Sequence, residues 1–448
     1  MAEDITWAVE SIKARAEHDA LMSGYYRGDQ RLAFATAKFK SVFGKALSAF
    51  ADNLCQAVIE TQTSRLRITG FTSEDGDETV VKSAWDVWLK NRMDAQAAVV
   101  HREGKITGDG YVIVWPDREG LPRIYPNRSQ QVTIERDDEE PERILKAGKL
   151  WRRKDKYWRL NLYYPDRIEK MITISAGDNA PDKAAAYQSF EEQGVAWPLV
   201  NPWGVVPVFN FSNNLTYGTR GRSELADIVP LQDALNKSVT DMLVVMEFAA
   251  MPQRYVTGIE IEIDETSGRP KQTPFEPGVD RVWSVAAPDA RFGEFTPAGL
   301  SQFIDVQESF RMEIARVSGI PLHYLMLKGD FPSGEAMRVA ESRLVAKIEA
   351  AQTEWGNVWE NVMALCLAMQ GQAGARLSAM WRDAMPADES ATLEQALIKK
   401  QLGVSMAQIQ REIGYSDDQI AQMAAEVQTA NALLGEGLLT AFDQGRDA

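Results

Sequence analysis

The chain has 448 residues, enough for two or three domains, and its 49 Lys and Arg face 64 Asp and Glu, for a formal charge of −15. This charge disfavours a protein that holds nucleic acid tightly by neutralising phosphates, although it allows contact with DNA that slides. The N-terminus lacks the basic and apolar regions of a signal peptide, and the most apolar window, 242–252, is too short to span a bilayer. We therefore expect neither secretion nor a membrane segment.

The first two hundred residues predict a mixed α and β domain. Apolar residues recur at helical spacing over 2–22, 38–58, 80–89 and 97–100. Apolar and polar residues alternate, or branched residues run together, over 65–71, 111–115, 132–135, 145–153, 157–164 and 207–209, which indicates strands. Residues 178–194 are small and polar and predict a surface loop.

A group of cationic residues lies in the predicted strands between 143 and 159. Its members are Arg143, Lys146, Lys149, Arg152, Arg153, Lys154, Lys156 and Arg159. We favour the solvated face of a hairpin. The alternative is a basic patch for a partner or for DNA phosphates, with Arg152, Arg153, Lys154 and Lys156 as its contacts.

Two helices flank a small insert in the second half of the chain. Ser223 is expected to cap the first helix, which carries an apolar stripe to Met246 and which Pro230 should kink or restart. The second should begin at Thr296 and Pro297 and end at Gly319. The proline-rich insert between them predicts a small α/β or β module, and the two helices would then run antiparallel.

A loop and a very long helix follow. Residues 322–333 carry apolar side chains without a helical period and are interrupted by Lys328, Gly329 and Asp330, so we expect a connector. Ser333 should cap a helix of some 35 residues, a rod of roughly 50 Å. After the glycines at 371 and 374 we expect only short helices, with capping boxes at Ser405 and Ser416.

The chain lacks the sequence patterns of the common catalytic sites. No phosphate-binding loop and no nucleophile elbow occur, and the three histidines are far apart without ligand-spaced neighbours. Cys55 and Cys366 lie in apolar helical patterns and are expected to be packed in a core. We therefore expect no enzyme, no cofactor and no metal.

The order and spacing of several motifs resemble the bacteriophage portal protein family of long-tailed phages, over nearly the whole chain. The motifs are Tyr25-Tyr26-Arg27-Gly28 with Arg31-Leu32, Gly221-Arg222-Ser223-Glu224-Leu225 running into residues 230–237, Ser333-Gly334-Glu335-Ala336, Trp355-Gly356 with Trp359, Gly403-Val404-Ser405 and Gly414-Tyr415-Ser416.

This resemblance implies an α+β portal-type fold. Its parts would be a mixed α/β wing (1–221), two antiparallel stem helices (222–251 and 297–318), a small α/β clip (252–296), a tunnel loop (319–333), a long strut helix (334–371) and a crown of short helices (372–448). The tunnel-loop candidates are Gly319, Ile320, Pro321, His323, Tyr324, Lys328, Gly329, Asp330 and Phe331. The clip candidates are Arg254, Tyr255, Arg269, Lys271, Arg281 and Trp283.

The resemblance also implies a function and partners. Twelve copies would form a ring at one capsid vertex of the virion, assembled in the host cytoplasm, through which double-stranded DNA is packaged and ejected without sequence specificity. The partners would be the terminase packaging motor, a head–tail adaptor, and the major capsid and scaffolding proteins, with no membrane involved. The alternative is a nucleic-acid-processing or regulatory protein that uses the basic cluster between Arg143 and Arg159.

Overall fold

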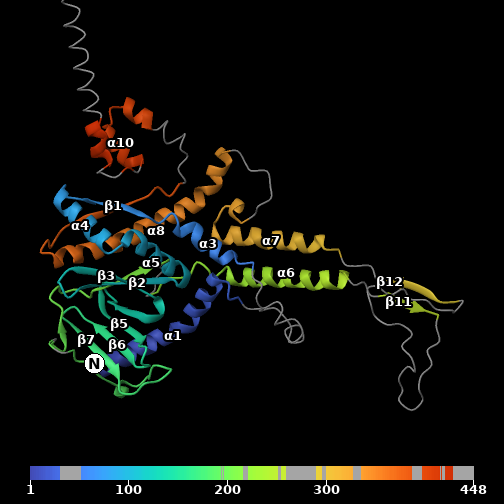
Figure 1. Ribbon diagram of the computed structural model, residues 1–448, viewed down its shortest axis with the longest axis horizontal. Helices are drawn as coiled ribbons and strands as arrows, with labels where there is room; N and C mark the ends of the chain where they lie inside the picture. The colour runs from blue at the N-terminus through green and yellow to red at the C-terminus, as the bar shows by residue number, and fades with distance from the viewer. Residues whose placement is uncertain are drawn as a thin grey trace, which may run out of the picture.

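A computed structural model describes residues 1–30, 52–192, 194, 196–214, 220–250, 254–258, 289–294, 299–325, 334–385, 396–413, 415 and 419–426. These residues form a layered α and β body from which a pair of helices projects (Figure 1). The mixed α+β class expected from the sequence is confirmed.

The N-terminal helix covers one face of an antiparallel sheet. Helix α1 (Ala2–Arg27) packs Ile5, Val9 and Ile12 against Leu150 and Leu160 of that sheet. Gly148 allows the close approach, because a Cβ there would lie 2.7 Å from the Cβ of Ala8. The strands follow the order β4 (Val132–Arg136), β5 (Ile144–Arg152), β6 (Trp158–Tyr163), β7 (Arg167–Thr173) and β8 (Tyr187–Ser189), and β9 (Leu199–Val200) also pairs with β7.

A three-stranded sheet forms the middle layer of the body. Its antiparallel strands follow the order β10 (Val208–Ser212), β2 (Asp109–Pro116) and β3 (Pro122–Asn127). One face of β2 packs Tyr111 and Ile113 toward the six-stranded sheet, and the other turns Val112 and Val114 toward helices α5 (Met93–Thr107) and α8 (Gly334–Met369). Successive side chains of β2 point to opposite faces, and each face packs in a core. Strand β2 is therefore almost wholly buried.

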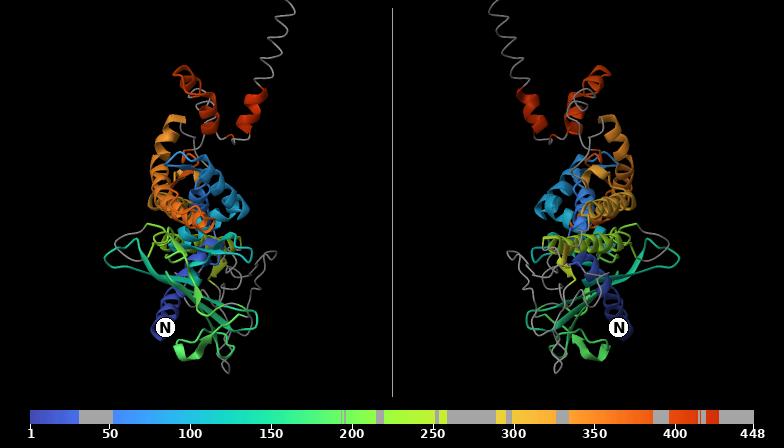
Figure 2. Two further views of the ribbon diagram at one scale, coloured as in Figure 1. Left: turned by 90° about the vertical axis from the view of Figure 1, so that its left-hand side faces the viewer. Right: turned by 90° about the vertical axis from the view of Figure 1, so that its right-hand side faces the viewer.

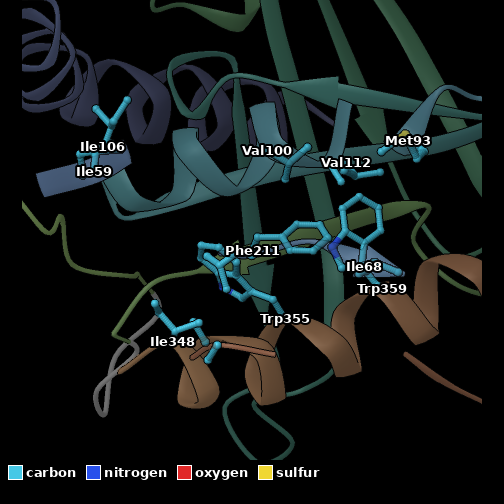
Figure 3. Packing of buried hydrophobic residues seen from close by; sticks show 14 of the residues in the cluster. Ile59, Ile68, Met93, Val100, Ile106, Val112, Phe211, Ile348, Trp355 and Trp359 are labelled. Atoms are coloured by element: carbon cyan, nitrogen blue, oxygen red, sulfur yellow. The ribbon is translucent and has the colours of Figure 1, made fainter. Parts of the chain in front are cut away.

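The largest core is aromatic and lies between α5, α8 and a two-stranded sheet. Strand β1 (Ile68–Ser73) pairs antiparallel with β13 (Leu377–Trp381), beside α3 (Leu54–Thr63) and α4 (Glu78–Lys90). Trp359 meets Phe211 at 4.6 Å and Trp88 at 5.0 Å between ring centroids. Figure 3 shows Trp355 and Trp359 reaching from α8 toward Phe211 and toward Val100 of α5. These buried aromatic rings stabilise the packing of α8 against the body.

The projecting part is a helical hairpin with two strands at its tip. The chain leaves the body along α6 (Val229–Ala250), pairs β11 (Arg254–Thr257) with β12 (Arg291–Glu294), and returns along α7 (Ser301–Ser318) (Figure 1). Helices α6 and α7 lie side by side and run in opposite directions (Figure 1). Helix α10 (Met406–Ile413) lies beyond α8, on the side away from the six-stranded sheet (Figure 2). The described residues also contain the short 3-10 turns η1 (Ser129–Gln131), η2 (Ala184–Ala186) and η3 (Leu322–Tyr324).

Two predicted helix starts, at 223 and 297, are wrong, and a third predicted helix is interrupted. The helix predicted over 38–58 is interrupted, because residues 52 and 53 are not helical and α3 begins at Leu54, where Asn53 accepts a hydrogen bond from the Gln56 N–H. The predicted start at residue 38 lies outside the described residues. Helix α6 begins at Val229, because Ser223 caps only a short turn and Pro230 fits the first turn of a new helix. Helix α7 begins at Ser301 rather than at 297.

Other errors concern strands. Residues 178–194 were expected to form only a loop, yet they contain β8, whose Tyr187 is buried against α1. Strands β3 and β7 were not predicted. The segment after residue 371, expected to hold only short helices, first forms β13. The long helix agrees with its predicted bounds, and both cysteines are buried and free as expected.

Candidate functional site at the junction of helices α7 and α8

Gly319 ends helix α7 as the sequence predicts. Its φ of 76° lies in the left-handed region, and its N–H donates to the carbonyl of Ala315 at 2.9 Å. A Cβ at this position would lie 3.2 Å from Nε of Arg343 on α8. Only glycine therefore combines this backbone conformation with the close packing of α8.

The chain after Gly319 is held to the body by buried contacts. Ile320 and Pro321 are buried, and η3 then places Tyr324 beside α8. The Tyr324 hydroxyl donates to Oε1 of Glu341 at 2.8 Å and accepts from Arg65 at 2.8 Å. This turn is therefore a fixed base from which the segment 326–333 departs.

Arg65 connects this base to two distant parts of the chain. Its guanidinium pairs with Glu341 at 2.8 Å and donates to the carbonyl of Ala384 at 3.1 Å, just after β13. Burial raises the pKa of Glu341, but Arg65 and Tyr324 outweigh it and hold that pKa below its usual value. Nε2 of His323 lies 3.6 Å from the same carboxylate. Glu341 thus stays ionised and binds the base of the loop to α8.

A second buried ion cluster supports the same junction from the side of the body. Glu224 pairs with Lys105 of α5 at 3.3 Å and with Lys347 of α8, which also donates to the Ser318 carbonyl at 3.2 Å. Burial opposes the charge of Glu224, yet Lys105 and Lys347 lower its pKa to about 2. The cluster therefore joins α5, α8 and the end of α7 through one carboxylate.

Sequence reasoning missed Arg65, Lys105, Glu224, Glu341 and Lys347. One signal was available for those on α8. Glu341 and Lys347 each fall at a spacing of three from Leu344, on the apolar face of a helix. A charged residue on an apolar face must be paired, so it marks a buried contact with another element.

The predicted loop residues are only partly described. Gly319, Ile320, Pro321, His323 and Tyr324 lie together at the base. Lys328, Gly329, Asp330 and Phe331 lie outside the described residues. At the tip of the helical hairpin, Arg254 pairs in register with Glu294, and Tyr255 is exposed. Arg269, Lys271, Arg281 and Trp283 lie outside the described residues.

Half of the eight residues of the basic cluster are paired with acids, Arg143 among them. Lys146 contacts Asp4 and Glu135, Arg152 contacts Asp178, and Arg153 contacts Asp155 at 3.1 Å. Lys154 and Lys156 are exposed in the turn between β5 and β6. This pairing supports the solvated face of a hairpin more than a patch for phosphates.

The described part of the chain offers neither a membrane-spanning helix nor a metal site. No helix there is both long and apolar enough to cross a membrane. No three His, Cys, Asp or Glu side chains in those residues are placed to hold a metal ion.

Comparison with known proteins identifies the family. A family model described as phage portal protein, SPP1 Gp6-like, matches residues 14–432. The portal protein of Mycobacterium phage L5 is 26% identical over 412 residues, covering 85% of this chain and 79% of that protein. The portal protein of Mycobacterium phage D29 is 24% identical over 351 residues, covering 72% and 67%.

A solved structure gives a more distant likeness. A chain in the neck of an empty gene transfer agent particle has a TM-score of 0.47 at 13% identity, covering 84% of this chain and 93% of that chain. The family match spans nearly the whole sequence and agrees with the motifs identified in it. The chain therefore belongs to the SPP1 Gp6-like family of phage portal proteins.

Proposed function

We propose that this chain is the subunit of a ring, a dodecamer by resemblance, at one vertex of a phage capsid. The ring is a structural conduit, without catalytic activity, through which DNA enters during packaging and leaves during ejection. Family membership supports this function, and one structural observation carries it. A helical hairpin with strands at its tip projects from the body, its second helix ends at a glycine cap, and a 36-residue helix is the next α-helix of the described chain.

We assign the parts of the subunit as the resemblance implies, with one change. Residues 372–385, expected in the crown, join the wing (1–221), because β13 pairs with β1. Helices α6 and α7 are the stem, residues 252–296 the clip, 319–333 the tunnel loop, α8 the strut, and the residues after 385 the crown. The clip receives the terminase motor and later the head–tail adaptor, whereas the wing faces the capsid and scaffolding proteins.

The helical hairpin leaves apolar surface that a ring would cover. Residues 242–246 of α6 are five consecutive apolar side chains, none of them fully buried. On α7, Ile304 and Met312 are 49% and 46% exposed and lie two turns apart on one face. Two helices can bury only one stripe of each other, so neighbouring copies supply the remaining contacts.

The tunnel loop lines the narrowest part of the channel in this proposal. Lys328 then faces the lumen and touches phosphates transiently, while the acidic chain as a whole avoids holding DNA. Many lysines along the wall would bind each phosphate and slow the passage of DNA.

Electron microscopy of the negatively stained protein tests the ring. We expect rings with a central hole. The double variant Ile304→Glu with Met312→Glu should give monomers, since charge cannot be buried between copies. Gln302→Glu with Ser309→Glu, two exposed polar positions of the same helix, is the control and should still form rings. A native protein that stays a monomer or dimer under all conditions would favour a nucleic-acid-processing or regulatory protein.

A further inference from the structure

One face of the six-stranded sheet carries cations that no acid of the described residues pairs. Trp151 stands opposite Arg159, and Lys149 stands opposite Asn161. Residues directly opposite each other on neighbouring strands share a face, so these four side chains lie together. The intervening residues Leu150 and Leu160 turn the other way and pack under α1.

Arg159 and Lys149 are framed by aromatic rings. The Arg159 Cζ lies 3.5 Å from the ring centre of Phe190 and 5.5 Å from that of Trp151, and the Lys149 Nζ lies 5.2 Å from Trp151. Arg159 is 8% exposed, and its buried Nε has no hydrogen-bond partner. Burial lowers the pKa of both Lys149 and Arg159. We name Lys149, Trp151, Arg159 and Phe190 the cationic face.

The cationic face differs from its surroundings because its cations are buried or half-buried and still unpaired among the described residues, whereas the unpaired Lys154 and Lys156 are exposed to solvent. Three neighbours in the same two strands and their turn, Lys146, Arg152 and Arg153, each reach a carboxylate of their own chain. The charge of Glu192 acts on Arg159, but the Glu192 carboxylate pairs with Lys170 at 2.9 Å and forms no ion pair with the guanidinium. A buried guanidinium that no carboxylate contacts is unfavourable by itself. A ligand that brings carboxylates to the cationic face would relieve that penalty.

The opposite charge occurs at the other end of the same strands. The turn between β4 and β5 contains five acids in residues 137–142. Asp137 shapes this turn by accepting from the N–H groups of Glu139 and Glu140. Asp138, Glu139 and Glu142 are exposed, and no described residue forms an ion pair with them. We name residues 137–142 the acidic turn.

The acidic turn cannot reach the cationic face of its own chain. Strand β5 starts at Ile144 beside the turn, and Trp151 lies seven residues further along. At about 3.3 Å per residue the two features are roughly 23 Å apart. They can meet only between different copies of the chain.

We propose that the acidic turn of one copy binds the cationic face of the next copy. This inference rests on the proposed ring and names one of its contacts. A contact between two different surfaces of identical chains repeats head to tail and can close into a ring. A planar guanidinium stacked on aromatic rings suits the two oxygens of a carboxylate. Duplex phosphates fit less well, because Arg159 is only 8% exposed and a side-chain carboxylate reaches a recessed guanidinium more easily than a rigid duplex does.

Cross-linking of the full-length protein tests this contact. The double variant Glu139→Cys with Lys149→Cys, treated with a short bis-maleimide, should give a ladder of covalent oligomers. The native cysteines are buried and should not react. Each single variant is a control. A second control joins Lys149→Cys with Asp75→Cys, an exposed acid between β1 and α4, and should give no ladder.

Sedimentation supplies an independent measurement. Neutralising the exposed acids with Asp138→Asn, Glu139→Gln and Glu142→Gln should raise the protein concentration for half-assembly by about tenfold, and added salt should shrink that difference. Asp75→Asn is the matched control and should leave assembly unchanged.

Three outcomes would overturn the inference. Rings that form normally but give no ladder refute the contact while leaving the proposed function intact. A native protein without rings refutes both. Binding of a short DNA duplex that Arg159→Gln abolishes would assign the cationic face to DNA instead.

Discussion

His101 is a fully buried histidine that uses both ring nitrogens. Nδ1 lies 3.1 Å from the carbonyl of Leu66, and the Trp359 indole donates to Nε2 at 2.9 Å. The ring stacks on Trp355 at 5.1 Å. Because Nε2 accepts, Nδ1 carries the proton and the ring is neutral. This side chain therefore joins α5, α8 and the approach to β1.

Because His101 is buried in its neutral form, lowering the pH should reduce the free energy of unfolding. Burial lowers the pKa of His101 from 6.5 to about 3. Between these values the unfolded chain binds a proton that the folded chain does not, so stability is complete above pH 6.5 and falls as the pH drops toward 3. The loss is about 1.4 kcal/mol per pH unit inside that window. Denaturant unfolding of the native protein and of His101→Gln between pH 7 and pH 5 measures it.

The variant should be less stable at pH 7 and should lose less stability on acidification. His18→Gln is the control, since the His18 side chain is 51% exposed, and it should follow the native protein. Parallel pH profiles for the native protein and His101→Gln would contradict the prediction.

The Glu224 carboxylate should contribute far more to the free energy of unfolding than a surface acid does. Glu224→Gln leaves Lys105, 2% exposed, without its counter-charge, and removal of one partner of a buried pair costs roughly 3–5 kcal/mol. Asp227→Asn is the control. The ion pair between Asp227 and Arg222 spans 2.6 Å, but both side chains are more than half exposed, so about 1 kcal/mol or less is expected. Equal unfolding free energies for the two variants would be the contrary result.

At the scale of the element, Gly319 controls where α7 stops. A side chain with φ of 76° is strained by about 1–2 kcal/mol, and a branched one would also displace Arg343, which donates to the Arg316 carbonyl at 2.8 Å. We expect Gly319→Val to lower the melting temperature and to reduce ring formation in micrographs. Gly299→Val, where a Cβ would meet, among the described residues, only Ser301 Oγ at 4.0 Å, should change neither. Intact rings with Gly319→Val would show that ring formation does not depend on the glycine cap.

Strand β13 should define the shortest stable body. A chain that ends at residue 385 keeps β13 on β1, with the Ala379 N–H on Glu360 at 2.9 Å and Leu377 buried. A chain that ends at residue 371 loses them, and the loss of Leu377 alone costs about 2–5 kcal/mol. Thermal unfolding should separate the two truncations clearly. Equal melting temperatures would show that β13 adds nothing to the body.

These elements show what the sequence could predict. Long periodic segments such as α8 and single punctuating residues such as Gly319 carry their own signal, because capping and helical spacing are local. Strand β13 could not be predicted, since its five residues gain their conformation from β1, far away along the chain. The ion partners of Glu224 could not be predicted for the same reason, because Lys105 and Lys347 are far from it along the chain. The cationic residues were predicted as a group, but only the strand register separates Arg159 from Arg152.

At the scale of the whole molecule, the tip of the helical hairpin should be separable from the body. Because α6 and α7 are antiparallel neighbours, a short Gly/Ser turn in place of residues 252–296 should join them without unfolding the body. We expect the melting temperature to stay near the native value while motor docking and tail joining are lost. Counting DNA-filled heads measures this. A Gly/Ser replacement of residues 154–156 is the control, and heads that fill with the clip replaced would contradict the assignment.

The pairing of β1 with β13 has a consequence for synthesis on the ribosome. Helix α1 and the six-stranded sheet are complete once residue 200 has emerged, and they can fold early. Trp88 and Phe71, in contrast, cannot pack until their partners Trp359 and β13 have been synthesised, nearly three hundred residues later in the chain. At 5–20 residues per second that delay is roughly 15–60 s. During this time an aromatic surface is uncovered, so the nascent chain, more than the finished subunit, is the form that needs a chaperone.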